Sequence, residues 1–246
     1  MTTLISAPIA GFKQYSLGDW FDWIMNQDDT DVKVCLATNG RDSLLLKAEL
    51  EKIQLVHKTH VPIQLIVVDL PHSEKNTIIQ NITYARELCR RTAKKENCEH
   101  LLFLDTDTIP LNLSTIQILK ATGFNAVSGL YFYKNSKEPV AIDEDTGTNF
   151  NLEKLKEAYE KRQTIPAWGF GFGCFLMHKE VFSKYAFDYD LFGENKTDDF
   201  GYIELLHRNG VKTWLHPYIT CKHLTSNDNF HKLNEATQIL INKEEN

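Results

Sequence analysis

Two aspartates that follow an apolar run are the residues of this chain best suited to chemistry. Leu101–Leu104 is apolar, and Asp105 and Asp107 come directly after it. Two unpaired carboxylates this close repel each other and raise one pKa unless a cation lies between them. Oxygen ligands suit a hard divalent ion, so the spacing predicts a site for Mg²⁺ or Mn²⁺. A turn in which both aspartates only cap backbone amides is the structural alternative.

The elements that must position these aspartates alternate between strands and helices. Strands are predicted at Val32–Thr38, Ile63–Asp69 and Leu101–Leu104, with helices at Ser43–His57 and Thr77–Lys95 between them. This alternation is typical of a parallel sheet with crossover helices, which makes the fold class α/β. Such sheets bind ligands at the carboxyl ends of their strands. We therefore expect four polar side chains at one edge of the sheet: Thr38, Asp69, Asp105 and Asp107.

A glycine-rich aromatic segment, Ala167–Cys174, is the second feature that indicates a ligand. Every second residue is glycine, at positions 169, 171 and 173. Because glycine has no side chain, a diphosphate or a sugar could come close to this backbone. Trp168 and Phe170 offer flat apolar faces on which a sugar can pack. A glycine-rich bend surrounded by aromatic core residues is the alternative.

The pattern changes after Pro110, and we predict one domain over residues 1–246 because no linker divides it. It comprises an N-terminal helical extension (1–30), a nucleotide-binding half (31–124), a mixed acceptor-side and catalytic half (125–224) and a polar, partly helical tail (225–246). The further elements predicted are helices at 114–122, 153–162 and 198–208 and strands at 126–133, 139–142 and 211–215.

The extension contains an amphipathic helix at residues 16–26. Ser16 and Asp19 have the spacing of a capping box, and apolar residues recur at helical spacing from Leu17 to Ile24. We interpret this helix as packed on the core. Weak peripheral contact with a membrane through residues 16–26 is the alternative, which the acidic Asp19 and Asp22 disfavour because anionic lipids attract basic faces.

Composition excludes several classes of protein. The chain has 246 residues, 42% of them hydrophobic, and a formal charge of −6. These values describe a folded domain and argue against nucleic-acid binding, which needs basic patches. The five cysteines form no close pair, and no apolar run reaches the ~20 residues of a spanning helix. We therefore expect a cytoplasmic protein that is at most membrane-peripheral.

In their order and spacing, several motifs resemble the glycosyltransferases of the type-A fold, particularly family-2-like members. The resemblance covers roughly residues 32 to 224 and implies a Rossmann-like, mostly parallel central sheet flanked by helices, with a smaller mixed acceptor-side region. The segments that carry it are Val32–Arg41, Leu65–Asp69, Tyr84–Arg86, Asp105–Asp107, Val127–Tyr131, Gly169–Met177, Asp198–Phe200 and Cys221–His223.

The resemblance also implies roles for individual residues. Asp107, with Asp105 and His223, would hold the metal, and Asp199 would be the catalytic base, with Asp198 in reserve because the family usually has Glu there. Asp198 and Asp199 are also suited to capping the first turn of a helix, and His223 to an ordinary structural role. Arg86 could bind a phosphate or an acid of the site, or form a structural salt bridge. The donor-binding residues would be Thr38, Asp69, Arg86, Asp105, Gly171 and Gly173, and the acceptor side would include Trp168 and Gly169.

The implied activity is metal-dependent transfer of a sugar from a UDP- or GDP-sugar to a hydroxyl of a glycan, lipid or protein-linked acceptor, with inversion. A haloacid-dehalogenase-like phosphatase is an alternative, since its nucleophile motif is also an apolar strand followed by Asp-x-Asp; Asp105 would be the nucleophile. A nucleotidylyltransferase would need a glycine-rich basic loop after its first strand, which residues 38–42 lack. A non-catalytic protein that binds nucleotide-sugars remains a further alternative.

Overall fold

The computed structural model describes residues 1–9, 11–39, 65–70, 77–134, 136–192, 196–224 and 235–241. The predicted helix at 43–57 lies outside these residues. The strands are β1 (Thr3–Pro8), β2 (Val32–Asn39), β3 (Leu65–Leu70), β4 (His100–Phe103), β5 (Thr108–Pro110), β6 (Ala126–Leu130), β7 (Ala141–Asp143), β8 (Ile165–Phe170), β9 (Phe175–His178) and β10 (Trp214–His223).

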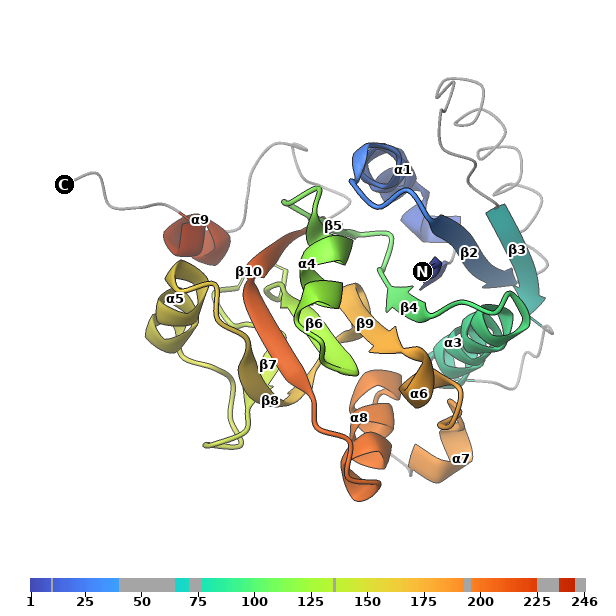
Figure 1. Ribbon diagram of the computed structural model, residues 1–246. Helices are drawn as coiled ribbons and strands as arrows, with labels where there is room; N and C mark the ends of the chain where they lie inside the picture. The colour runs from blue at the N-terminus through green and yellow to red at the C-terminus, as the bar shows by residue number, and fades with distance from the viewer. Residues whose placement is uncertain are drawn as a thin grey trace.

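One mixed sheet organises the molecule (Figure 1). Its strand order is β3-β2-β1-β4-β9-β6-β10-β8-β7, with β5 pairing to β10 outside this path. The first four strands in this order are parallel to one another, whereas β9 is antiparallel to both β4 and β6. The order reverses between β1 and β4, because β2 and β3 lie on the other side of β1. A parallel sheet binds ligands at this kind of switch point, so the segments that follow β1 and β4 are the ones to inspect.

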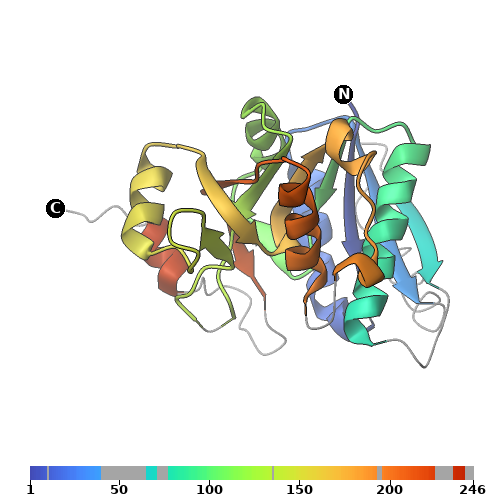
Figure 2. The ribbon, with the colours of Figure 1, turned by 90° about the horizontal axis from the view of Figure 1, so that it is seen from below.

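Strand β1 corrects the predicted helical extension. Residues 3–8 form a strand that pairs with β2 on one side and β4 on the other, so this part of the chain lies inside the sheet. Figure 2 shows β1 among the parallel strands, beside helix α3. The strand predicted to open the sheet, Val32–Thr38, is therefore the second one and is observed as Val32–Asn39. The prediction failed because β1 is short and its pairing partners lie far along the chain.

The helices are η1 (Gly11–Ser16), α1 (Leu17–Asn26), α3 (Ile78–Lys95), α4 (Thr115–Ala121), α5 (Leu152–Glu160), η2 (Phe172–Cys174), α6 (Lys179–Phe182), α7 (Tyr189–Phe192), α8 (Asp198–Arg208) and α9 (Glu235–Ile241). Alternate strand residues belong to two separate cores: Leu4 packs with α3 and α8, whereas Ile5 packs with α1 and α4. Strand side chains alternate between faces, so the two cores lie on opposite faces of the sheet. In the tail, α9 packs against α5.

Two helix starts differ in how they are capped. Thr77 and Gln80 form a complete capping box at the start of α3, which confirms the predicted helix boundary there. Ser16 makes no side-chain cap at α1; its hydroxyl instead donates to the Lys13 carbonyl at 2.8 Å, so the capping box predicted with Asp19 is wrong. This bond tightens the η1 turn that carries Lys13.

The apolar face of α1 is covered by protein. Leu17, Trp20, Phe21, Trp23 and Ile24 are all buried, and the Trp20 indole donates to the Leu104 carbonyl at 3.0 Å. The helix therefore packs on the core, as its composition predicted, and ties the chain after β1 to the end of β4. Within the described ranges, no helix has the length and apolar character needed to cross a bilayer.

Candidate functional site

The turn after β4 directs Asp105 and Asp107 to different partners. Hydrogen bonds to the backbone hold this turn: the Asp105 amide donates to the Gly173 carbonyl at 3.2 Å, and the Leu224 amide donates to the Asp107 carbonyl at 2.7 Å. The first bond joins the turn to η2, and the second joins it to the end of β10. The two aspartates therefore lie where β4, η2 and β10 meet, although their side chains separate.

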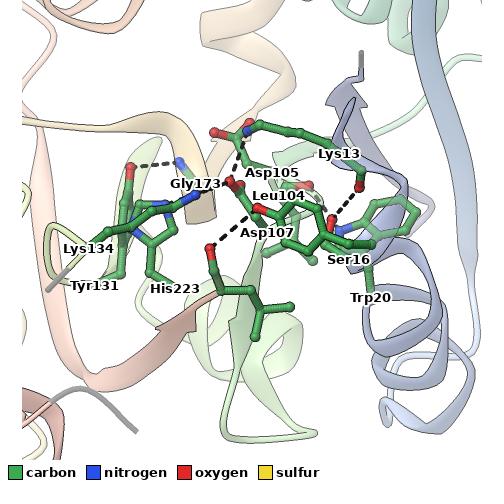
Figure 3. Close-up of polar contacts among 12 residues, drawn as sticks. Lys13, Ser16, Trp20, Leu104, Asp105, Asp107, Tyr131, Lys134, Gly173 and His223 are labelled. Carbon is green, nitrogen blue, oxygen red and sulfur yellow. Dashed lines mark hydrogen bonds and ion pairs between the residues drawn. The ribbon is translucent and has the colours of Figure 1, made fainter. Parts of the chain in front are cut away.

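Asp107 is a buried carboxylate with two lysine partners (Figure 3). Its Oδ2 lies 3.0 Å from Nζ of Lys13 and 2.9 Å from Nζ of Lys134, while only 3% of its side chain is exposed. Burial by itself favours the protonated acid, but Lys13, His223 and Lys134 outweigh it and lower the pKa of Asp107. Asp107 is consequently an anion at neutral pH, as a metal ligand must be.

His223, at the end of β10, faces the same carboxylate oxygen. Its Nε2 lies 3.8 Å from Oδ2 of Asp107, and its Nδ1 lies 3.0 Å from the Phe132 carbonyl. A carbonyl can only accept, so Nδ1 carries the proton and Nε2 presents its lone pair toward Asp107. Burial lowers the pKa of His223 and outweighs the opposing effect of Asp107. The lowered pKa favours this neutral form. Tyr131 packs edge-on against the ring.

The Asp107–His223 pair is suited to holding a divalent cation together with a ligand that brings its own oxygens. A 3.8 Å gap between a carboxylate oxygen and an imidazole lone pair can be bridged by one ion bound to both. The carbonyl that fixes the imidazole is the usual second partner of a metal-binding histidine. Across the described residues, no three His, Cys, Asp or Glu side chains gather into a metal-binding group. The remaining ligands would have to be phosphate oxygens and water, as is common for Mg²⁺.

Asp105 is separated from Asp107 by its pairing with Arg86 of α3. The guanidinium contacts Oδ1 of Asp105 at 3.3 Å and Oδ2 of Asp198 at 2.5 Å. It is buried between the rings of Phe103 and Phe172, whose centroids lie 5.0 and 5.3 Å from its central carbon. Two interpretations of Arg86 were open, a phosphate ligand or a partner of an acid. The structure gives it two acids, and the bridge joins the turn after β4 to α8.

Asp199, beside Asp198 at the start of α8, has the opposite electrostatic environment to Asp107. It accepts hydrogen bonds from the Phe200 amide at 2.8 Å and from the Thr197 hydroxyl. Burial, followed by repulsion from Asp198, raises the pKa of Asp199 to about 6. Asp199 and Asp105 both act on the ionisation of Tyr131 and of Arg86, so they share one electrostatic environment. A carboxylate with this pKa is suited to accept a proton near neutral pH.

An aromatic platform lies next to this base. Trp168 of β8 has 38% of its surface exposed and stacks on Phe200 of α8, with centroids 6.2 Å apart. The ring of His207 meets Trp168 edge-on at 6.0 Å. Phe200 follows Asp199 directly in the chain, so one ring of the platform belongs to the same helical turn as the predicted base. The acceptor-side role of Trp168 stays a prediction, which its exposed ring and its stacking on Phe200 support.

The comparisons with known proteins concern the fold. No family model and no curated protein sequence matches the chain. Among solved structures, the mannosyltransferase PcManGT from Pyrobaculum calidifontis, in complex with GDP-Man and Mn²⁺, matches with a TM-score of 0.59 at 14% identity, over 97% of this chain and 60% of that one. GalNAc-T7 with UDP, GalNAc and Mn²⁺ matches with a TM-score of 0.59 at 13% identity, over 92% and 44%.

The chain has the type-A glycosyltransferase fold. It spans less than two thirds of the length of both glycosyltransferases. The inositol-1-phosphate CTP transferase from T. maritima also matches, with a TM-score of 0.54 at 12% identity, over 97% of this chain and 94% of that one. At these identities the likenesses establish the architecture, and the chemistry has to be inferred from the side chains.

The glycine-rich segment of this fold serves packing. A Cβ on Gly171 would lie 2.1 Å from the Tyr131 hydroxyl, and one on Gly169 would lie 2.9 Å from the Phe200 ring. At Gly173, a Cβ would meet Tyr131 and the Thr108 hydroxyl, both at 2.8 Å. The space on the Cβ side of each glycine is thus filled by protein. The predicted roles of Gly171 and Gly173 in donor binding and of Gly169 in substrate binding stay predictions, and this packing favours the alternative of a glycine-rich segment among aromatic side chains.

Thr38 and Asp69 lie on the far side of β1 from the Asp105 turn. They are paired in register on β2 and β3, which confirms that their strands are neighbours. The Thr38 hydroxyl is buried and has no hydrogen-bond partner among the residues that the structure describes. Strands β2, β3 and β4 are parallel, so Thr38 and Asp69 lie at the same edge of the sheet as the Asp105 turn, with β1 between them. The roles of Thr38 and Asp69 in binding a donor stay predictions.

The sequence analysis missed Lys13 and Lys134. Lys13 follows β1 and Lys134 follows the segment after β6, and both contact Asp107. The strand β1 was the available signal for Lys13, because a cation placed directly after it reaches the switch point between β1 and β4. Lys134 gave no local signal, since it reaches Asp107 from a part of the chain 27 residues away.

Proposed function

We propose that the protein transfers a sugar from a nucleoside-diphosphate-sugar to a hydroxyl acceptor, with a divalent cation on Asp107 and His223 and with Asp199 as the base. The observation that carries this proposal is the arrangement of the carboxylates. Asp107 is an anion beside the lone pair of His223, and Asp199 has a pKa of about 6. The Arg86 bridge joins the turn after β4, which carries Asp107, to α8, which carries Asp199. The type-A fold of known nucleotide-sugar enzymes agrees with it.

The proposed reaction assigns a distinct task to each region. A bound divalent cation supplies positive charge that stabilises the departing diphosphate. The acceptor hydroxyl loses its proton to Asp199 while its oxygen bonds to the anomeric carbon. The bond from that carbon to the phosphate oxygen breaks with its electrons going to the diphosphate. Attack opposite the leaving group inverts the anomeric configuration. Trp168 and Phe200 would hold the acceptor beside the base.

The first test is a screen for the donor. Melting temperatures would be measured with UDP, GDP and their common sugars, each with Mn²⁺, with Mg²⁺ and with EDTA, because a ligand that binds only the folded state raises the melting temperature. We expect one nucleotide series to stabilise the protein most strongly with Mn²⁺, since a nitrogen ligand favours Mn²⁺ over Mg²⁺. The active donor would then be followed to product by anomeric NMR. A retained configuration would overturn the single-displacement mechanism.

The alternatives give different results in the same assays. The haloacid-dehalogenase-like reading is opposed by the fold and by the pairing of Asp105 with Arg86, and it would require a phosphorylated Asp105. A nucleotidylyltransferase would release pyrophosphate from a nucleoside triphosphate. The glycine-rich loop of such an enzyme would follow β1, the first strand of this chain. Residues 9–16 contain one glycine, Gly11, so this segment is as poor in glycine as residues 38–42. A pure binding protein would be stabilised by the donor without transferring or hydrolysing it.

A further inference from the structure

One carboxylate oxygen with two lysine partners is the feature that the proposed reaction leaves unused. Lys13 and Lys134 reach Oδ2 of Asp107 from different sides, Lys13 from η1 and Lys134 from the side of Tyr131 and His223 (Figure 3). This is the same oxygen that lies 3.8 Å from the His223 lone pair. The lysines therefore hold the position on Asp107 that a divalent cation would need.

The charges at this point do not balance. One carboxylate, that of Asp107, faces two ammonium groups, those of Lys13 and Lys134. The neighbouring acids Asp105 and Asp198 are engaged with Arg86. The excess of ammonium groups over carboxylates is therefore local to Oδ2 of Asp107, because the single charge of Arg86 is shared by Asp105 and Asp198. A surplus of this kind is suited to an anionic ligand.

The two lysines can also reach a ligand. Their side chains are 27% and 35% exposed, against 3% for Asp107. Lys13 follows β1, and Asp107 follows β4, so both flank the point at which the strand order reverses, where ligands bind in such sheets. A lysine ammonium binds phosphate as a compact point charge on a flexible stem. A diphosphate bound here would lie within the reach of both stems.

We propose that Lys13 and Lys134 clamp the Asp107 carboxylate in the free protein and move to the diphosphate of the donor when donor and cation bind together. The inference rests on the proposed function, because it takes the donor to be a nucleoside-diphosphate-sugar. It explains how the buried Asp107 carboxylate can bind two lysine ammonium groups in the free protein and a divalent cation in the complex. A cation alone has to displace both ammonium groups and binds weakly. The diphosphate draws the lysines away, so each ligand strengthens binding of the other.

The test uses the full chain with Lys13→Gln, Lys134→Gln and the double variant. Lys33→Gln is the matched control, because Lys33 is 26% exposed and pairs with a single carboxylate, Glu96, on a different part of the molecule. Free Mn²⁺ is measured by electron paramagnetic resonance without nucleotide. Binding of UDP and GDP, and of uridine and guanosine, is measured by calorimetry with and without Mn²⁺.

The proposal requires two opposite changes. Removing the lysines should tighten binding of Mn²⁺ alone and weaken binding of the nucleoside diphosphate, each by at least about tenfold in the double variant, as expected for losing charge-assisted contacts. Nucleoside binding and the Lys33→Gln control should be unchanged. A misfolded variant would lose both affinities, so the tighter Mn²⁺ binding cannot come from damage. The single variants provide the same test if the double variant does not fold, and Lys13→Arg and Lys134→Arg should restore diphosphate binding.

Failure of this inference differs from failure of the proposed function. If the wild-type protein binds UDP or GDP and the lysine variants bind it equally well, the lysines do not contact the diphosphate. If Mn²⁺ alone binds the variants no more tightly, the lysines do not compete for Asp107. Either result overturns the exchange while the proposed reaction stands. If the wild-type protein binds neither nucleotide under any condition, the proposed function and the inference both fail.

Discussion

Asp107 and Asp199 are residues of one type whose surroundings move their pKa values in opposite directions. Asp107 faces two lysines and a histidine and stays anionic, with a lowered pKa. Asp199 is enclosed beside another acid, and its pKa rises to about 6. Pairs of acids whose environments separate their pKa values are typical of sites that divide electrostatic and proton-transfer roles between them. Under the proposed function, the first carboxylate would bind the cation and the second would accept the proton.

The positions of their partners make this division possible. Lys13 and Lys134 come from segments after β1 and β6, whereas the Asp198 that raises the pKa of Asp199 adjoins it in sequence. Arg86 keeps the two environments connected, because its guanidinium contacts both Asp105 and Asp198. A variant at either aspartate should therefore disturb one function and spare the other.

The largest effect is expected from Asp107→Asn. The amide keeps the shape of the side chain but loses the charge that attracts a cation, and it leaves Lys13 and Lys134 without an anion. Sugar transfer should fall by roughly 10³-fold, equivalent to about 4 kcal/mol of transition-state stabilisation. Donor turnover and Mn²⁺-dependent donor binding would both be measured. Asp145→Asn is the control, because Asp145 also pairs with a lysine but is exposed on a distant turn. Donor binding that still responds to Mn²⁺ would contradict the assignment.

The next effect is expected from Asp199→Asn. Asparagine can still accept the hydrogen bond from the Phe200 amide, but it cannot take up the acceptor proton. Turnover should fall by at least about 10²-fold, while the donor affinity stays near that of the wild type. Steady-state kinetics and calorimetry with the donor would separate the two quantities. Asp190→Asn, on the exposed part of α7, controls for a general loss of charge. Parallel loss of binding and turnover would mean that Asp199 is not a base.

A pH profile sharpens the same comparison. Asp199 acts as a base only when ionised, so kcat/KM should fall as the pH drops through about 6, by about tenfold per unit below that point. Repulsion from Asp198 contributes to this high value, so Asp198→Asn should move the limb to lower pH. The measurement is kcat/KM between pH 5 and pH 8 in both proteins. An identical limb in the variant would show that Asp198 does not set the pKa.

Local signals in the sequence predicted much of the fold. Helix α3 has a capping box and a long apolar face, both readable from residues a few positions apart, and its predicted start is confirmed. The turn after β4 was predicted in the same way. Strand β1 was missed because its place is fixed by β2 and β4, which lie far along the chain. The close packing of Gly171 and Gly173 could not be predicted for a similar reason, since Tyr131, 42 residues from Gly173, fills the space beside them.

The sequence predicted the acidic residues of the candidate site, but not how its basic residues pair with them. Asp105, Asp107 and Asp199 stand in recognisable local settings, at a strand end or a helix start. Their partners come from elsewhere, so the sequence did not indicate which acids Arg86 binds or that two lysines bind Asp107. The chemistry of each carboxylate is set by those partners. The acids can therefore be located from the sequence, whereas the partners that set their pKa values cannot.

The smallest effect is on stability, and its sign is opposite to that on activity. The pKa of Asp199 is about 6 in the folded protein and near 3.8 in the unfolded chain, so the folded state binds a proton more tightly between those values. Above pH 6 the folded protein has to keep an enclosed anion beside Asp198. Asp199→Asn removes that anion and should raise the free energy of unfolding at pH 8 by roughly 1–2 kcal/mol, allowing for partial exposure to solvent. Urea denaturation measures this gain.

The gain should depend on pH in a way that a simple packing change would not. As the pH falls from 6 toward 4, the wild-type carboxyl becomes protonated in the folded state, and the difference between the two proteins should shrink and disappear. Asp107→Asn should behave oppositely. Its parent carboxylate has a lowered pKa and stabilises the fold above pH 4, so that variant should be less stable at pH 8. If both substitutions changed stability in the same direction at pH 8, the two carboxylates would not occupy opposed environments, and the division between cation and proton would lose its physical basis.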